Sequence, residues 1–289
     1  MTEPRLQFVQ CLNPSGLHRM AYWEWGETAN PRVLVCAHGL ARQGRDFDTF
    51  AKTLTDHYRV VCPDVVGRGR SEWLGNAAHY QIPQYVADMV TLIARLNATQ
   101  IDWVGTSMGG LIGIGLAAMQ GSPMRRLVLN DVGPTIQFDS LQRIGTYLGN
   151  NMSFPSFDAG QDFLRSISAS FGPHTDEQWH ALSRPMLVEK DDGQFHLHYD
   201  PAIAQPFRLV TQEFAAAGEV ALWAAYDQIR CPTFLLRGAE SDLISSATAQ
   251  AMSQRGPKAQ RLDVPGVGHA PTLQNDDQIC PLREFLLAP

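Results

Sequence analysis

Short apolar runs that lead into turn-forming residues recur along the first half of this chain. They occupy Val33–Ala37, Arg59–Cys62, Ile101–Val104 and Leu127–Leu129, and each reaches a Gly, Pro, Asn or Asp within two residues. Runs this short, rich in β-branched residues, are typical of strands buried on both faces. Apolar residues at helical spacing lie between them, most clearly over residues 85–96. The alternation predicts a mostly parallel sheet with right-handed helical crossovers.

A different pattern precedes this block. Leu6–Leu12 and His18–Trp25 are separated by the turn residues Asn13-Pro14-Ser15-Gly16. Two extended segments joined by so short a turn pair side by side. We therefore predict an antiparallel hairpin on one edge of the sheet.

The short apolar runs stop after Asp131 and reappear at Thr233–Leu236 and Arg261–Val264. The intervening residues, about 133–212, hold amphipathic helical pieces and loops, with no clear buried strand. An insertion between two strands of one sheet explains this pattern better than a second domain does. We predict an α/β core formed by residues 1–132 and 213–289, with a helical cap over 133–212.

Composition limits the classes of protein and partner. The chain has 289 residues, of which 44% are hydrophobic and 18% charged, so it can bury a substantial core without disulfides or metals. The formal net charge is −6 and the basic residues are scattered, whereas binding to a nucleic-acid backbone needs clustered cations. We expect no nucleic-acid partner, and a monomer or homodimer that acts on a small molecule.

The sequence shows no pattern typical of a secretory signal or a membrane span. The N-terminal residues 1–7 contain an acid and no apolar stretch, and the most apolar run, Leu111–Met119, is about half the length that spans a bilayer. The five cysteines are widely spaced and form no CxxC pair. These features predict a cytoplasmic protein with no membrane association.

The strongest chemical signal is Gly105-Thr106-Ser107-Met108-Gly109-Gly110, which follows a strand-like run and precedes a helix-like one. A tight strand-to-helix turn exposes a serine at its apex, and small residues two positions before and after let the backbone cross itself. The helix N-terminus favours developing negative charge nearby. We predict that Ser107 is a nucleophile.

A serine nucleophile needs a base, which a third group must orient. His269 suits the first role because it lies in a turn-rich loop after the Arg261–Val264 strand. Asp242 suits the second role, since it lies in a short loop beyond the Thr233–Leu236 strand. Asp131 also ends a strand and competes for this role. We favour Asp242, with Asp131 left open.

An oxyanion needs two backbone donors. The predicted donors are the N–H groups of Met108, next to the nucleophile, and of Leu40, in the loop after Val33–Ala37. His38 is interpreted as holding that loop, and the segment Asp64–Ser71 as a supporting turn, because it lacks a phosphate-loop pattern. No metal-ligand spacing is found, so we expect neither a metal nor another cofactor.

At this point the sequence resembles the α/β-hydrolase superfamily. The resemblance rests on motifs that follow the family's order over about residues 20–275: His38-Gly39, Asp64-x-x-Gly67-x-Gly69-x-Ser71, Gly105-x-Ser107-x-Gly109, Asp242 after Arg237-Gly238, and Gly268-His269. The resemblance implies an eight-stranded, mostly parallel sheet with a helical cap inserted after the sixth strand. Thr106 departs from the pattern, because many relatives carry His there.

The resemblance implies serine chemistry on an acyl carbon, as in an esterase, lactonase, thioesterase or cofactor-free perhydrolase. We favour an esterase or lactonase that cleaves a small to medium substrate through an acyl-enzyme. Ser107 argues against dehalogenase and epoxide hydrolase chemistry, in which the nucleophile is an aspartate. A C–C bond hydrolase of diketone-like substrates and a ligand receptor on a hydrolase scaffold remain as alternatives. Arg42 and Arg45 could bind a substrate carboxylate, although surface solvation is favoured for both. The cap offers aromatic residues for a pocket: Phe138, Tyr147, Phe154, Phe157, Phe163, Phe171 and Trp179.

Overall fold

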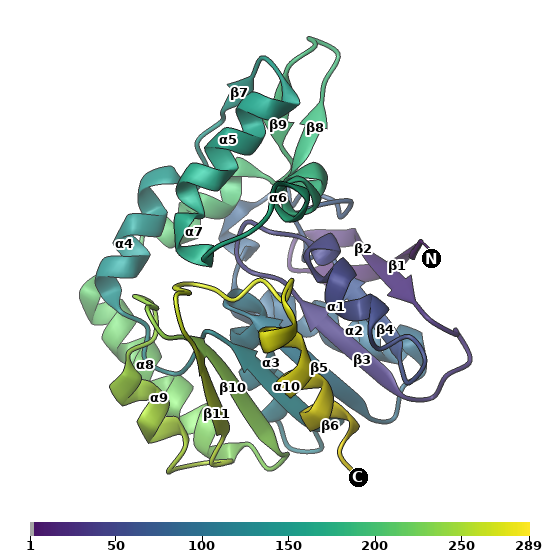
Figure 1. Ribbon diagram of the computed structural model, residues 1–289, viewed down its shortest axis with the longest axis vertical. Helices are drawn as coiled ribbons and strands as arrows, with labels where there is room; N and C mark the ends of the chain where they lie inside the picture. Colours follow the sequence, from purple (N-terminus) through teal and green to yellow (C-terminus); the bar gives the residue numbers. More distant parts are fainter. Residues whose placement is uncertain (1–2) are drawn as a thin grey trace.

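The computed structural model describes residues 3–289, so the first two residues of the segment 1–7 lie outside it. An eight-stranded sheet runs through the molecule (Figure 1). Its strands are β1 (Arg5–Asn13), β2 (Gly16–Trp25), β3 (Val33–Ala37), β4 (Arg59–Pro63), β5 (Ile101–Thr106), β6 (Met124–Asn130), β10 (Thr233–Gly238) and β11 (Gln260–Val264). Their spatial order is β1-β2-β4-β3-β5-β6-β10-β11.

Strand directions agree with the expectations from sequence. β1 and β2 form an antiparallel hairpin at the edge, and β2 joins β4 antiparallel. All the remaining pairs are parallel. The predicted mostly parallel sheet with an edge hairpin is confirmed.

Helices cover both faces of the sheet. One layer holds α2 (Ile82–Leu96), α3 (Met108–Ala117), α8 (Gln212–Gln228) and α9 (Ser246–Met252), and the other holds α1 (Asp48–Lys52) and α10 (Asp276–Leu287). Side chains alternate along each strand, so Val35 packs in the first layer while Leu34 and Cys36 pack in the second. This two-sided burial is why the strands appear as continuous apolar runs in the sequence.

Helix α2 shows how the apolar spacing becomes a buried stripe. The apolar residues at helical spacing in the range 85–96 are buried: Tyr85, Met89, Leu92, Ile93 and Leu96. A proline in the first turn suits the start of the helix, and Asn97 ends it in the left-handed conformation with φ of 53°. Each fully buried leucine or methionine contributes about 1.5–3 kcal/mol.

The elements between β6 and α8 form a separate group above the sheet (Figure 1). Its helices are α4 (Phe138–Tyr147), α5 (Phe157–Ile167), α6 (Asp176–Ser183) and α7 (Ala204–Arg208). It also contains a three-stranded antiparallel sheet, made of β7 (Ser153–Phe154), β9 (Phe195–Leu197) and β8 (Leu187–Glu189). The sequence indicated helices only, because strands of two or three residues are too short for alternation to be detected.

The insertion follows the sixth strand, as expected, and has a small core of its own formed by Phe154, Leu164, Met186 and Leu187. Helix α8 packs against the sheet layer through Tyr226. The predicted division of the chain into a core (1–132 and 213–289) and a cap (133–212) stays a prediction. Short 3₁₀ turns connect the elements: Gly44–Phe47, Ala77–His79, Ala169–Phe171, Arg184–Met186 and Pro201–Ile203.

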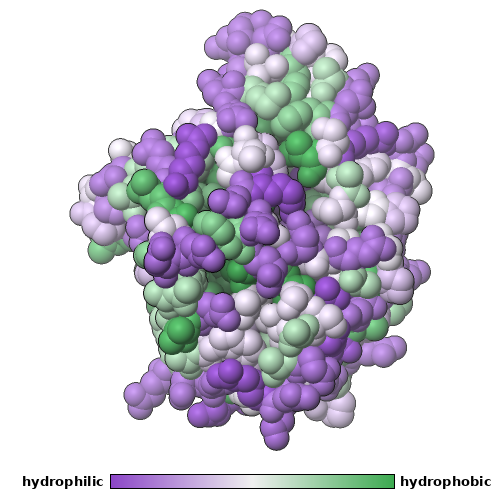
Figure 2. Space-filling model, turned by 90° about the vertical axis from the view of Figure 1, so that its left-hand side faces the viewer, coloured by the Kyte–Doolittle hydropathy of each residue, from purple (hydrophilic) through white to green (hydrophobic). Residues whose placement is uncertain are grey.

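The surface that carries α4, α8 and α9 is mixed in character. Figure 2 faces this side and shows apolar areas between charged ones. The α7–α8 segment exposes Leu209, Phe214 and Val220. Within residues 3–289, no helix is both long enough and apolar enough to cross a membrane.

Candidate active site

Ser107 occupies a sharp turn between β5 and α3. Its φ of 53° and ψ of −117° place a non-glycine residue in a strained conformation, which a close crossing of the chain maintains. A Cβ on Gly105 would lie 2.3 Å from the carbonyl oxygen of Gly109, and one on Gly109 would lie 2.0 Å from that of Ala37. The structure therefore supports the expected steric need for glycine on both sides of the serine.

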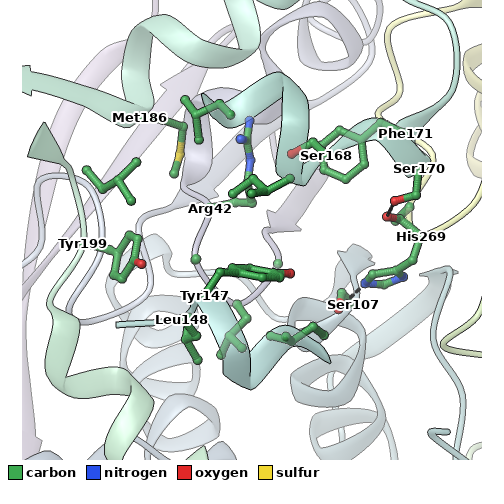
Figure 3. A pocket seen from close by; sticks show the side chains of 18 of the residues that line it. Arg42, Ser107, Tyr147, Leu148, Ser168, Ser170, Phe171, Met186, Tyr199 and His269 are labelled. Carbon is green, nitrogen blue, oxygen red and sulfur yellow. Dashed lines mark hydrogen bonds between the residues drawn. The ribbon is translucent and has the colours of Figure 1, made fainter. Parts of the chain in front are cut away.

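His269 lies in the loop after β11 and points at Ser107 (Figure 3). Its Nε2 is 2.9 Å from Ser107 Oγ. The inserted segment helps to hold this loop, because Ser170 Oγ donates to the His269 carbonyl oxygen at 2.8 Å and the Gly268 N–H donates to the Ser170 carbonyl oxygen at 2.7 Å. The predicted pairing of serine and histidine is present.

The third group is Asp131. Its Oδ2 lies 2.6 Å from Nδ1 of His269 and also accepts a hydrogen bond from Ser241 Oγ at 2.6 Å. Its Oδ1 accepts from the Gly238 N–H at 2.8 Å. Asp131 is fully buried, with a left-handed φ of 54° directly after β6. Three donors thus hold the carboxylate in place, and Ser107, His269 and Asp131 form one hydrogen-bonded chain.

The prediction that Asp242 orients the imidazole is wrong. Asp242 has a side chain 47% exposed, and its Oδ2 pairs with the guanidinium of Arg143 at 2.6 Å, in the inserted helix α4. The physical reason is distance along the chain. β10 ends at Gly238, so Asp242 lies four residues beyond the sheet edge, whereas Asp131 directly follows Asn130 at the end of β6.

The order of the strands in the sheet accounts for the position of Asp131. β6 is the immediate neighbour of β5, which carries Ser107, whereas β10 is one strand further away. The loop after β10 contributes Ser241 instead, whose hydroxyl donates to Asp131. Sequence reasoning also missed Asn130, whose amide donates to Thr106 Oγ1 at 2.9 Å and to the Pro271 carbonyl oxygen at 2.8 Å. Asn130 thereby links the serine turn to the histidine loop.

The loop after β3 lies beside the serine. A Cβ on Gly39 would be 3.7 Å from the Cβ of Ser107, which places the Leu40 amide close to the nucleophile. His38 Nδ1 lies 2.7 Å from the Gly39 carbonyl oxygen, while the Val65 N–H donates to His38 Nε2 at 2.9 Å. Because Nε2 accepts, the proton is on Nδ1 and donates to that carbonyl.

This hydrogen bond has a consequence for the peptide that joins Gly39 to Leu40. In a trans peptide the carbonyl and the following N–H point in opposite directions. Fixing the Gly39 oxygen therefore fixes the direction of the Leu40 N–H. Arg68 Nε donates to the Leu40 carbonyl oxygen at 2.8 Å and fixes the next peptide in turn. The expected loop-holding role of His38 is consistent with these contacts.

Burial lowers the pKa of His38 from 6.5 to about 3. An imidazole whose folded-state pKa is depressed stays neutral while the unfolded chain takes up a proton. Stability is therefore highest above pH 6.5 and falls as the pH decreases from 6.5 toward 3. The expected slope from this one group is about 1.4 kcal/mol per pH unit.

His38→Gln tests this expectation, because glutamine keeps one acceptor and one donor but does not titrate. We expect the free energy of unfolding in urea to rise more steeply with pH in the wild type than in the variant, by a slope approaching about 1.4 kcal/mol per unit between about pH 4 and 5.5. Other groups titrate in both proteins and cancel in the difference. Equal slopes would show that His38 titrates normally.

The segment Asp64–Ser71 supports the neighbouring loops. The buried Asp64 carboxylate accepts from the N–H groups of Gly44 and Arg70, each at 2.8 Å. Burial raises the pKa of this carboxyl to about 6, against the opposite effect of those hydrogen bonds. Gly69 has a φ of 53°, and a Cβ there would lie 2.4 Å from the carboxyl carbon of Asp64. This packing agrees with a supporting turn.

A cavity of about 130 Å³ extends from Ser107 and His269 between the sheet and the inserted segment (Figure 3). Of the cap aromatics that the sequence suggested, Tyr147, Phe163 and Phe171 line it, whereas Phe154 packs within the core of the insertion. Most of its other lining is apolar: Leu40, Ile144, Leu148, Leu164, Ile167, Met186, Leu197 and Tyr199. The arrangement can place an apolar chain beside the serine.

Two arginines line the same cavity, Arg42 and Arg143. Arg42 forms a bidentate pair with Asp46, with both distances 2.7 Å, and also donates to the Leu182 carbonyl oxygen. Arg45, the other arginine suggested by the sequence, pairs with Asp48 and does not line the cavity. The donors of Arg42 are therefore largely occupied by partners within the protein.

One group of metal-ligand types is buried elsewhere. Cys11, His18 and Asp88 place their ligand atoms within 4.8 Å of one another, between the edge hairpin and α2. Asn13 Oδ1 accepts from the Ser15 N–H, so its Nδ2 donates to His18 Nδ1 at 3.0 Å. The proton of this imidazole is then on Nε2, 3.0 Å from Asp88 Oδ2. The group is a satisfied hydrogen-bond network.

Comparison with known proteins agrees with the fold. A profile of the alpha/beta hydrolase family matches residues 34–282. The chain belongs to the alpha/beta hydrolase family. The chain is 57% identical over 285 residues to a 3-hydroxybutyrate-oligomer hydrolase of Cupriavidus necator, covering 98% of this chain and 97% of the relative.

Two solved structures of family members are also similar. A putative hydrolase from Rickettsia typhi has a TM-score of 0.88 at 29% identity, covering 98% of both chains. An alpha/beta hydrolase from Novosphingobium aromaticivorans has a TM-score of 0.86 at 32% identity, covering 99% of both chains. These likenesses extend over nearly the whole chain, including the inserted segment.

Proposed function

We propose that this protein is a carboxylic-ester hydrolase that works through an acyl-enzyme on Ser107. The hydrogen-bonded chain from Ser107 through His269 to Asp131 carries the proposal, because it is the arrangement that activates a serine hydroxyl. Asp131 takes the orienting role first given to Asp242. The family membership supports hydrolysis as the reaction.

In the proposed reaction, Ser107 Oγ attacks the ester carbonyl while His269 Nε2 takes its proton. The carboxylate of Asp131 holds the imidazole in the correct tautomer and stabilises the imidazolium. The N–H groups of Leu40 and Met108 donate to the oxyanion, supported by the contacts that orient the Gly39–Leu40 peptide and by the start of α3.

Collapse of the tetrahedral intermediate releases the alcohol, to which His269 returns the proton. Water then enters, His269 deprotonates it, and the acyl-enzyme is hydrolysed to the carboxylic acid and free Ser107. Both proton transfers pass through Nε2 of His269, which lies 2.9 Å from Ser107 Oγ. The strained turn at Ser107 keeps the nucleophile exposed at the cavity.

We infer that the substrates are oligomers of 3-hydroxybutyrate or esters of similar size. The relative from Cupriavidus necator, similar along nearly the full chain, carries that activity in its name. Each hydroxybutyrate unit is a short, methyl-branched chain. The mainly apolar cavity beside Ser107 suits such a chain, which carries few polar atoms per unit.

A substrate panel tests this inference. We expect the protein to hydrolyse the dimer and trimer of 3-hydroxybutyrate with kcat/KM at least about tenfold above that for a p-nitrophenyl ester of a long acyl chain, because a long chain exceeds the cavity. Product release is followed by chromatography. A vinylogous diketone and a lactone in the same panel test the C–C hydrolase and lactonase alternatives, and preference for either would contradict the proposal.

Labelling with a fluorophosphonate separates an enzyme from a ligand receptor on the same scaffold. We expect stoichiometric labelling of Ser107, since its hydroxyl lies 2.9 Å from the base. Absence of labelling would favour the receptor.

A further inference from the structure

The second cation of the cavity, Arg143, differs from Arg42 in how it is held. Arg143 lies on α4 and reaches the cavity from the same side as Tyr147, one turn further along the helix. Its Nε and Nη2 both contact a single oxygen, Oδ2 of Asp242, at 3.0 and 2.6 Å. The two side chains are 44% and 47% exposed, whereas those of Arg42 and Asp46 are 16% and 17% exposed.

These differences make Arg143 the cation that a ligand can recruit. An ion pair as exposed as Arg143–Asp242 contributes little to stability, so exchanging one carboxylate partner for another costs little. Arg42, by contrast, forms a bidentate, largely buried pair with Asp46 and a further hydrogen bond to the Leu182 carbonyl oxygen. Among the described residues that line the cavity there is no acid, so an entering anion meets only these two cations.

The chemistry of the substrate proposed above supplies such an anion. An oligomer of 3-hydroxybutyrate carries one free carboxylate, on the alcohol side of its last ester bond. Arginine forms paired hydrogen bonds to carboxylates, and its planar guanidinium suits that geometry better than an ammonium does. The carboxylate can then replace Asp242 as the partner of Arg143 without leaving a buried charge unpaired.

We propose that Arg143 binds the free carboxylate of the substrate, and that Asp242 holds the guanidinium in position while the cavity is empty. The protein then selects esters whose alcohol portion bears a carboxylate. This inference rests on the proposed function, because it names a feature of the substrate cleaved at Ser107. Asp242, first expected to be a catalytic acid, becomes the resting partner of a specificity-determining residue.

The test compares Arg143→Gln with the wild type on two substrates, the 3-hydroxybutyrate dimer and its methyl ester, at low ionic strength. We expect the variant to raise KM for the dimer about tenfold, the size of a lost charge-assisted hydrogen bond at a partly exposed site. Kinetic constants for the methyl ester change less than about twofold, because that substrate has no carboxylate. Arg143→Lys recovers part of the loss, since it keeps the charge but not the paired geometry.

Arg165→Gln is the matched control. Arg165 also lies on a helix of the insertion, pairs with an exposed aspartate, Asp176, and does not line the cavity. We expect it to leave the kinetics of both substrates unchanged. Asp242→Asn removes the competing carboxylate and lowers KM for the dimer about twofold to threefold. Equal effects of Arg143→Gln on the dimer and its methyl ester, or no effect on either, would overturn the inference.

A second measurement keeps this inference separate from the proposed substrate. 3-Hydroxybutyrate is used as a competitive inhibitor of p-nitrophenyl acetate hydrolysis, with butane-1,3-diol as the uncharged analogue. Arg143→Gln should raise the inhibition constant of the acid about tenfold and leave that of the diol unchanged. If the wild type fails to cleave the dimer but Arg143→Gln still weakens inhibition by the acid and not by the diol, only the assignment of oligomers as substrates is overturned. If the wild type cleaves the dimer but Arg143→Gln leaves the inhibition constant of the acid unchanged, only the proposed role of Arg143 is overturned.

Discussion

We expect Ser107→Ala to abolish ester hydrolysis, with kcat for a short p-nitrophenyl ester reduced about a million-fold. The expected loss is this large because, in the proposed mechanism, the hydroxyl forms the acyl-enzyme, and no other hydroxyl hydrogen-bonds to Nε2 of His269 in the described residues. Water attack assisted by the remaining donors supplies only residual activity. The measurement is a steady-state assay with the variant at high concentration.

Two controls exclude loss of folding and a nonspecific effect of replacing a serine. The side chain of Ser107 makes its one hydrogen bond in the described structure to His269, so removing the hydroxyl should leave the melting temperature within about 2–4 °C of the wild type. Ser166→Ala, an exposed position on α5, should keep full activity and full fluorophosphonate labelling. If Ser107→Ala retained a tenth of the activity, the nucleophile would have to be another group.

We expect Asp131→Asn to lower kcat about ten thousand-fold, and Asp242→Asn to lower it less than threefold on an uncharged ester. Asparagine has the shape of aspartate but no charge, so it cannot stabilise the imidazolium that forms when His269 takes the proton. Its amide also cannot accept the three hydrogen bonds that Asp131 receives from Gly238, Ser241 and His269. The two variants are assayed side by side with p-nitrophenyl acetate.

The comparison is decisive because the two aspartates differ in environment. Asp131 is fully buried, whereas the side chain of Asp242 is 47% exposed and bound to Arg143. A folded Asp131→Asn protein, checked by circular dichroism, is required for the interpretation, because a buried carboxylate with three donors also contributes to stability. A greater loss in Asp242→Asn than in Asp131→Asn would restore the original assignment of the acid.

Much of the site was predictable because it depends on local sequence. The turn at Ser107 needs glycine at positions 105 and 109 whatever the rest of the fold does, since a Cβ at either would collide with backbone. The loop of His269 follows a recognisable strand. Both features are determined by residues within a few positions of the functional side chain.

The choice between Asp131 and Asp242 could not be made in this way. Both follow strands, and both are acidic residues in turn-rich loops. The distinction depends on which strand lies beside β5, and on how far each loop extends beyond the sheet edge. The small sheet of β7, β8 and β9 was missed because its strands are only two or three residues long, and because β7 pairs with β9 from about 40 residues away in the chain.

The sequence by itself determined the alternation of strands and helices, the sharp turn at Ser107 and the position of the insertion after the sixth strand. These follow from apolar periodicity and from steric limits on the backbone, which act over short stretches of chain. Tertiary structure decided which carboxylate meets His269 and which arginine stays free to change partners. Those outcomes depend on distances between residues far apart in the chain, such as the 2.6 Å between Asp131 and His269. No local pattern encodes such a distance, because the order of strands in the sheet sets it.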